Sequence, residues 1–274
     1  MSVGGWIWLR LAALVVILNG TFPIFWILLT SLKTESELTR RPITYLPEAP
    51  TLANYLRAFA EQPLERFVLN SFVVAILATG LSILVAALAA YALARLQIRG
   101  RNLILGALVA VSTFPLITLM VPLFQIMRGL GLLNTYFALI LPYAVLNLPV
   151  CTLVLVSFFE SIPRDLENAA RIDGCTRLGA LWRIVVPLSA PGVFTAAILA
   201  FVNAWDEFLL ALSFVSSHEM RTVAVGITLY QGEYAFPWPL ISAALIVALA
   251  PIALLIVTFQ EKVVSGLTQG GLKG

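Results

Sequence analysis

The chain has 274 residues, of which 60% are hydrophobic and only 11% are charged, whereas an ordinary soluble domain is about 25% charged. A soluble fold of this length has too little interior to bury so many apolar side chains, so the composition excludes a water-soluble domain. The formal net charge of +3 does not require a nucleic-acid partner, because Lys and Arg accumulate in the cytoplasmic loops of membrane proteins.

Six uncharged runs are each long enough to cross a bilayer, which takes a helix of about 20 residues. The first run is too long for the apolar core of a signal peptide and precedes no small-residue cleavage site, so we expect it to be retained. The expected fold class is therefore all-α, a polytopic bundle of six transmembrane helices in a single domain over residues 1–274. The runs cover residues 11–32, 67–94, 102–127, 129–159, 184–205 and 234–260.

Six spans place both termini on the same side of the membrane. If the N-terminus is cytoplasmic, that side carries ten Lys and Arg residues against seven outside, and five of those seven lie in the long first loop, residues 33–66. Because short loops govern the positive-inside rule, the relevant count is ten against two. We expect both termini and the loop at residues 160–190 to be cytoplasmic.

Helix-packing signals recur along the chain. In the first loop, prolines precede an amphipathic stretch that predicts a short surface helix from about Thr51. One helix face in the second run carries a small residue at every fourth position, which allows close helix packing: Ser82, Ala86, Ala90 and Ala94. Five prolines in later runs predict kinked helices, which either serve packing alone or surround a movable cavity, the interpretation that nearby Gln125 and Asn147 favour: Pro115, Pro122, Pro142, Pro149 and Pro251.

Motifs of enzyme chemistry are missing from the sequence. There is no H-E-x-x-H, no G-x-S-x-G, no Cys/His cluster and no G-x-x-x-x-G-K-[ST] phosphate loop. The single histidine, His218, falls in an expected outer loop, and Cys151 and Cys175 are interpreted as apolar fillers. We therefore expect no catalytic residue, no metal site and no cofactor bound by this chain.

Charge occurs inside the apolar zone in the stretch NAWDEF, residues 203–208. If the fifth span runs from about 193 to 214, Asp206 and Glu207 lie in its middle-to-outer half, where an uncompensated carboxylate costs at least about 2.5 kcal/mol. Three interpretations remain open: bonding at a helix or subunit interface, the lining of a solute passage, and a metal or proton site. The candidates for a passage are Asn203, Asp206 and Glu207, with Gln125 and Asn147 as weaker ones.

A polar island separates the fourth run from the fifth. Residues 160–183 contain four acidic residues and four arginines, so their net charge is zero. Pro163 suits the first turn of a helix, and Gly174 is a good terminator. We therefore expect a short helix from about Pro163 that breaks at Gly174, and a second over residues 177–185. Two acid-first i,i+4 pairs are expected to stabilise this segment: Glu167–Arg171 and Asp173–Arg177.

The first of these helices would also carry a small apolar patch formed by Ala169, Ala170 and Ile172. A plain cytoplasmic loop need not be so ordered. A docking element for a cytoplasmic partner explains both the order and the patch.

The segment ENAARIDGC, followed by RIVVPLSAPG, resembles the EAA motif of the membrane subunits of ABC importers. That motif has E-A-A, two residues and D-G, then a distal I-x-x-P or L-P. Asn168 stands in place of the family's glutamate, with Glu167 one position earlier. The positions that match the frame are Asn168, Ala169, Ala170, Asp173, Gly174, Ile184 and Pro187.

Stretches along essentially the whole chain are similar to carbohydrate-type permeases, particularly the maltose- and trehalose-type second subunit. They are SLKTESEL, PTLANYLRAF, NSFVVA, AAYALAR, AWDEF and GLTQGGLKG. The resemblance implies the type I ABC importer permease fold. It also implies a function as one permease of an ATP-driven importer, which forms half of the pathway for a sugar such as a di- or oligosaccharide.

The resemblance further implies the partners and the location. The partners are a second homologous permease, two ATPase subunits that hold the ATP and Mg²⁺, and an extracellular or periplasmic solute-binding protein. The location is the bacterial or archaeal cytoplasmic (inner) membrane.

Two parts of the chain are implied to contact the ATPases: the coupling loop, residues 160–190, which docks into an ATPase cleft, and the C-terminal tail, residues 261–274. The implied coupling residues are Glu167, Asn168, Ala169, Ala170, Arg171, Asp173 and Gly174. The implied tail contacts are Gln269, Gly270 and Gly271.

Three alternatives remain open, because the EAA motif does not name the cargo. The chain could be an importer permease for a non-sugar solute such as a polyamine. It could be an ion-coupled secondary transporter or channel, which would need an ion-coupling residue and no soluble ATPase. An intramembrane enzyme is disfavoured by the missing motifs.

Overall fold

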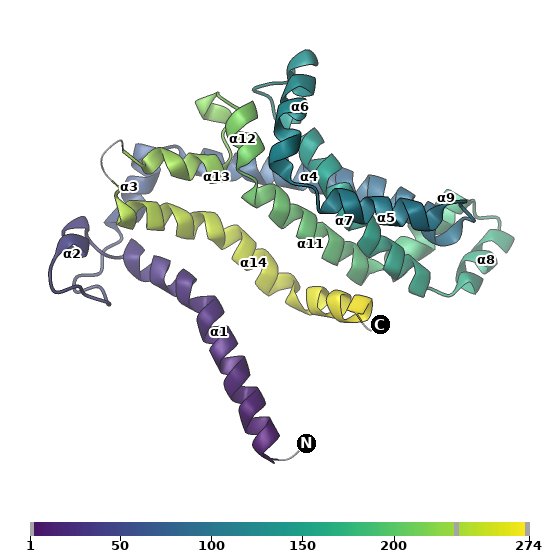
Figure 1. Ribbon diagram of the computed structural model, residues 1–274, viewed down its shortest axis with the longest axis horizontal. Helices are drawn as coiled ribbons and strands as arrows, with labels where there is room; N and C mark the ends of the chain where they lie inside the picture. The colour runs from purple at the N-terminus through teal and green to yellow at the C-terminus, as the bar shows by residue number, and fades with distance from the viewer. Residues whose placement is uncertain (1–2, 233–235, 272–274) are drawn as a thin grey trace. The chain divides into compact units, whose positions relative to one another are not determined.

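The computed structural model describes residues 3–232 and 236–271 (Figure 1). Within these ranges, side chains are described at residue 6 and from residue 8 to residue 260. All regular structure in these residues is helical, which confirms the all-α class. The helices are α1 (Val3–Ser31), α2 (Glu35–Thr39), α3 (Ala53–Glu61), α4 (Leu64–Arg95), α5 (Arg101–Ser112), α6 (Leu116–Gly129), α7 (Phe137–Ser161), α8 (Arg164–Ile172), α9 (Arg177–Ala180), η1 (Leu181–Val185), α10 (Val186–Leu188), α11 (Ala190–Asp206), α12 (Leu209–Phe214), η2 (His218–Met220), α13 (Val223–Gly226), η3 (Ile227–Tyr230) and α14 (Trp238–Gly271).

Four helices of the described chain are long and apolar enough to cross a membrane, and the number reaches six if each of two bent pairs is one span. The four are Trp8–Ser31, Leu64–Arg95, Phe137–Ser161 and Trp238–Gln260. The pairs are Arg101–Ser112 with Leu116–Gly129, bent by 94°, and Arg177–Leu188 with Ala190–Asp206, bent by 84°. The expected six spans therefore correspond to four long helices and two bent pairs.

Pro115 breaks the third expected span rather than kinking it. It precedes α6 with ψ at 122°, an extended conformation, and a proline also disfavours helical geometry in the residue before it. The other four predicted prolines lie inside helices α6, α7 and α14. A second break corrects the expectation of one span from about 193 to 214, because α11 ends at Asp206 and α12 begins only at Leu209.

The chain divides into two compact units, of which the first comprises Met1–Glu65 and Gly226–Ala253. In this unit the expected surface helix is α3, and its Asn54 amide donates to the carbonyls of Ser31 and Lys33, both at 2.8 Å, where α1 ends. The Tyr230 hydroxyl donates to the Ala58 carbonyl at 2.5 Å. Burial raises the pKa of Tyr230 to about 12. The phenol therefore stays protonated at neutral pH and can act as the donor in this hydrogen bond.

The second unit comprises Arg66–Val225 and Leu254–Gly274. The predicted small-residue face of α4 is buried in it, and the Ser82 hydroxyl lies 3.0 Å from the Ala144 carbonyl of α7. Helices α7 and α11 approach so closely that a Cβ added at Gly192 would lie 2.2 Å from Phe158. Small residues thus allow the helices of this unit to pack in direct contact.

Candidate functional site

The polar island folds as the predicted pair of short helices. Pro163 precedes α8, and Gly174 follows it with φ at +87°, in the left-handed region that favours glycine. The amide of Cys175 donates to Ala170 at 2.9 Å and that of Gly174 to Arg171 at 3.1 Å, which is the Schellman pattern at a helix C-terminus. The break expected at Gly174 is confirmed, and the second helix continues through α9 into the π-helical turn η1.

Glu167 faces the protein interior. Its carboxylate accepts a hydrogen bond from the Tyr91 hydroxyl and lies 3.3 Å from the Arg95 guanidinium, both on α4. The Arg95 side chain is only 4% exposed and also donates to the Ile162 carbonyl at 2.9 Å. This buried cluster attaches α8 to the end of α4.

Both predicted i,i+4 ion pairs are wrong. Glu167 is paired with Arg95 instead of Arg171, because its side chain points toward α4. In the described part of the chain Asp173 and Arg177 form no ion pair, because the helix ends between them at Gly174. The i,i+4 geometry that the prediction assumes exists only within one continuous helix.

The remaining coupling candidates are more accessible. Asn168, Ala169 and Arg171 are exposed, whereas Ala170 is half-buried. Ile172 is 86% exposed, so the predicted apolar patch is open to a partner. Asn168 is exposed at the position where the EAA motif has its glutamate. Because Glu167 is buried, it does not supply a carboxylate on this exposed face in place of that glutamate.

A polar network joins α7 to α11. The Asn147 amide, which is buried, donates to the Tyr143 carbonyl at 2.9 Å, and its oxygen accepts from Asn203 at 3.1 Å. The Tyr143 hydroxyl donates to Glu207 at 2.5 Å. The structure thus brings together three of the five passage candidates, Asn147, Asn203 and Glu207.

Glu207 stabilises the break that follows α11. Besides Tyr143, its carboxylate accepts the amides of Leu210 at 2.9 Å and Ala211 at 3.1 Å, which are free donors in the first turn of α12. For Glu207, these hydrogen bonds agree with the first of the three interpretations, in which the carboxylate is bonded where helices meet. Asp206, by contrast, is exposed and shares a face of α11 with the exposed Asn203, three positions earlier.

Gln125 does not belong to this network. It is exposed on α6 and hydrogen-bonds to none of the other candidates in the described part of the chain.

The sequence did not indicate three further residues of these polar clusters, namely Tyr91, Arg95 and Tyr143. The spacing of Tyr91 and Arg95, four positions apart at the end of a span, is the only sequence signal that could have indicated a shared polar face.

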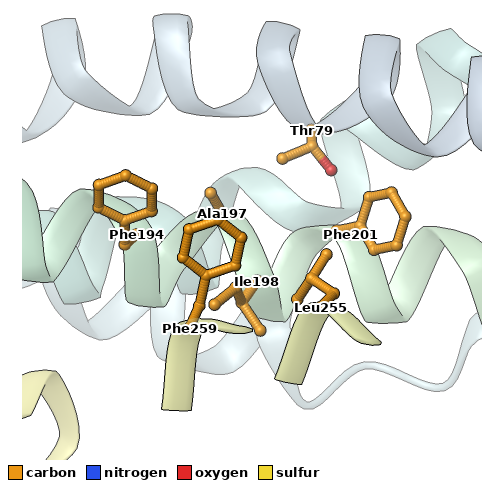
Figure 2. Close-up of a pocket in the computed structure, with 7 residues that line it drawn as sticks. All are labelled: Thr79, Phe194, Ala197, Ile198, Phe201, Leu255 and Phe259. Atoms are coloured by element: carbon orange, nitrogen blue, oxygen red, sulfur yellow. The ribbon is translucent and has the colours of Figure 1, made fainter. Parts of the chain in front are cut away.

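An apolar pocket of about 160 Å³ also lies in the second unit, among α4, α11 and the last part of α14 (Figure 2). Phe194 and Phe259 stack in it with ring centroids 5.6 Å apart. Among the described residues that line it, Thr79 has the one polar side chain, and its hydroxyl is buried without a hydrogen-bond partner in that part of the chain. This pocket lacks the several convergent polar groups that orient a sugar, and the polar candidates do not line it.

Three comparisons relate the chain to known proteins. Residues 78–269 match the family described as binding-protein-dependent transport system inner membrane component. The sulfoquinovosyl glycerol transport system permease protein SmoH of Agrobacterium fabrum is 70% identical over 264 residues, which cover 96% of this chain and 93% of the relative. The trehalose/maltose transport system permease protein MalG of Thermococcus litoralis is 38% identical over 269 residues, or 97% and 96% of the two chains.

A solved structure with the same fold is that of a bacterial ABC transporter involved in the import of the acidic polysaccharide alginate. One of its chains superimposes with a TM-score of 0.81 at 22% identity, covering 95% of this chain and 98% of that one. At this identity the likeness shows the fold alone.

Proposed function

The chain belongs to the family of inner membrane components of binding-protein-dependent transport systems, and on that premise we propose that it is one permease subunit of an ATP-driven sugar importer. As a member of this family it is a multi-pass membrane transport subunit and not an enzyme. Its proposed partners are a second homologous permease, two ATPase subunits that bind the ATP and Mg²⁺, and a solute-binding protein outside the membrane.

The proposed cargo is a sugar glycoside, with sulfoquinovosyl glycerol as the first compound to test. The observation that carries this proposal is the 70% identity to SmoH over 96% of the chain. The relative from Thermococcus litoralis is also named for sugars, trehalose and maltose. A polyamine cargo has no comparable support.

The proposed coupling element is α8 with Gly174, inside the loop at residues 160–190. It is an ordered helix with an exposed apolar patch, and its buried Glu167 ties it to the end of α4. In this proposal, α8 moves together with the ATPase and with α4. Coupling between two sites needs such a shared element, whose conformation depends on both of them. In this proposal residues 1–274 form a single permease domain with both termini cytoplasmic.

The proposed C-terminal contact lies largely outside the described residues. The backbone of Gln269, Gly270 and Gly271 continues α14, and their side chains are not described. Their contact with the ATPases stays a prediction.

Transport by reconstituted vesicles tests the proposal. Proteoliposomes that contain the complex purified through this chain are expected to take up labelled sulfoquinovosyl glycerol only with ATP at the ATPase side and the binding protein at the other. Ionophores that collapse proton and sodium gradients should leave the initial rate unchanged. Maltose and putrescine serve as alternative cargoes.

Uptake that stops with the ionophores and continues without ATP would contradict an ATP-driven importer. ATP-dependent uptake of putrescine alone would keep the importer and contradict the sugar class.

A further inference from the structure

A polar pocket of about 200 Å³ lies in the second unit where the end of α4 meets α8 and the start of α9. Its lining carries far more positive than negative charge. Four arginines and one carboxylate line it, together with the Asn168 amide: Arg95, Arg164, Arg171, Arg177 and Glu167.

The single carboxylate is already engaged. Glu167 is held by Tyr91 and Arg95 inside the protein, so it neutralises the buried Arg95 and no other guanidinium. In the described part of the chain, Arg164, Arg171 and Arg177 have no carboxylate within ion-pair distance. The pocket therefore keeps an excess of three positive charges, and an anion that enters it would relieve their mutual repulsion.

Asn168 contributes to this excess. It is exposed and lines the pocket, at the position where the EAA pattern has glutamate. A glutamate there would add a negative charge beside the three arginines that have no ion pair in the described part of the chain. The neutral amide leaves the pocket more strongly basic than the motif would make it.

The size and surroundings of the pocket favour a protein side chain as the anion. A volume of about 200 Å³ is below the roughly 300–1,000 Å³ of pockets that enclose whole small molecules. Exposed apolar side chains directly follow two of the arginines in the chain, Ile172 at 86% and Leu178 at 57% exposed. Arginines beside apolar anchors are typical of the centre of a protein interface.

We propose, building on the function proposed above, that this pocket receives the carboxylate of an Asp or Glu side chain of the partner ATPase. The planar guanidinium groups suit a carboxylate because they can donate two parallel hydrogen bonds to it. The contact would therefore have the permease as the positive side and the ATPase as the negative side.

Carbodiimide cross-linking of the purified complex tests the proposal directly. Carbodiimides join an amine and an adjacent carboxylate as an amide, and they do not couple a guanidinium. Arg171→Lys and Arg177→Lys keep the charge and introduce an amine, so each is expected to give a permease–ATPase cross-link to an Asp or Glu, identified by mass spectrometry. Arg183→Lys is the matched control, since Arg183 is exposed in the same loop but does not line the pocket.

Charge reversal provides the second measurement. Arg171→Glu is expected to weaken ATPase binding roughly tenfold or more through the loss of a charge-assisted pair, whereas Arg183→Glu should change it little. Equal ATPase binding by both variants, or cross-links at position 183 only, would overturn the proposal.

Two further outcomes are distinguishable. Release of a bound anionic phospholipid by Arg171→Glu, with ATPase binding intact, would assign the pocket to a lipid headgroup and overturn the proposal alone. A wild-type chain that retains no ATPase would overturn both this inference and the function on which it rests.

Discussion

Glu207 and Asp206 are neighbours in sequence with opposite environments. Glu207 accepts hydrogen bonds from the Tyr143 hydroxyl and from two amides at the start of α12. Asp206 ends α11 with its side chain exposed. The first carboxylate therefore stabilises the fold, whereas the second is exposed, and its place in a solute passage stays a prediction.

Alanine substitutions of the two carboxylates should separate stability from transport. Glu207→Ala leaves three donors without their acceptor and is expected to lower the free energy of unfolding by about 2–4 kcal/mol. Asp206→Ala is expected to change it by less than about 0.5 kcal/mol and to reduce uptake. Thermal unfolding of the purified chain and vesicle uptake measure the two effects. Normal uptake by an assembled Asp206→Ala complex would remove Asp206 from the passage.

At the scale of single elements, two features set the geometry of α8: its C-terminal turn and its polar contacts with α4. Its C-terminal turn needs a positive φ at Gly174, and its inner face is tied to α4 through Glu167. A Cβ added at Gly174 would meet nothing within 4 Å. Any effect of a substitution there thus comes from the backbone angle and from the partner, and not from a clash inside the chain.

Two substitutions at Gly174 therefore form a matched pair. Leucine is strained at positive φ by about 1–2 kcal/mol, whereas asparagine adopts that region more readily. Gly174→Leu is expected to insert normally and then to lose the ATPase or to hydrolyse ATP without uptake. Gly174→Asn should keep most of the coupling. Co-purification and the ratio of uptake to hydrolysis are the measurements, and full coupling in Gly174→Leu would show that this loop is not the coupling site.

At the scale of the whole molecule, the exposed surface indicates a hydrocarbon environment. Trp8, Val16 and Leu254 are 75%, 70% and 70% exposed, and they lie in helices long enough to span a bilayer. Water would oppose such an apolar surface, whereas lipid tolerates it because helices satisfy their own backbone hydrogen bonds.

The orientation of the chain is a prediction at the same scale. Because arginines are concentrated in the loops expected inside, a cysteine at Glu48 should react from outside with an impermeant maleimide, and one at Arg177 should not. Both positions are exposed, and Cys151 and Cys175 are replaced beforehand. Labelling of both cysteines in intact cells would contradict the predicted topology, and permeabilised cells provide the control for reactivity.

The sequence by itself determined the features that depend on neighbouring residues. Composition and run length predicted an all-α membrane protein. Pro163 and Gly174 predicted the limits of α8, because capping and positive φ act within a single turn. The small-residue face of α4 followed from helical period alone.

Only the tertiary structure decided which polar groups meet. Glu167 binds Tyr91, 76 positions earlier, and Tyr143 binds Glu207, 64 positions later. The sequence spacing pointed to Arg171 instead, since an i,i+4 neighbour is visible in the sequence and a partner on another helix is not. A carboxylate that loses its water on burial needs a hydrogen-bond donor that is buried beside it. The packing of α4, α7, α8 and α11 decides which donor lies there.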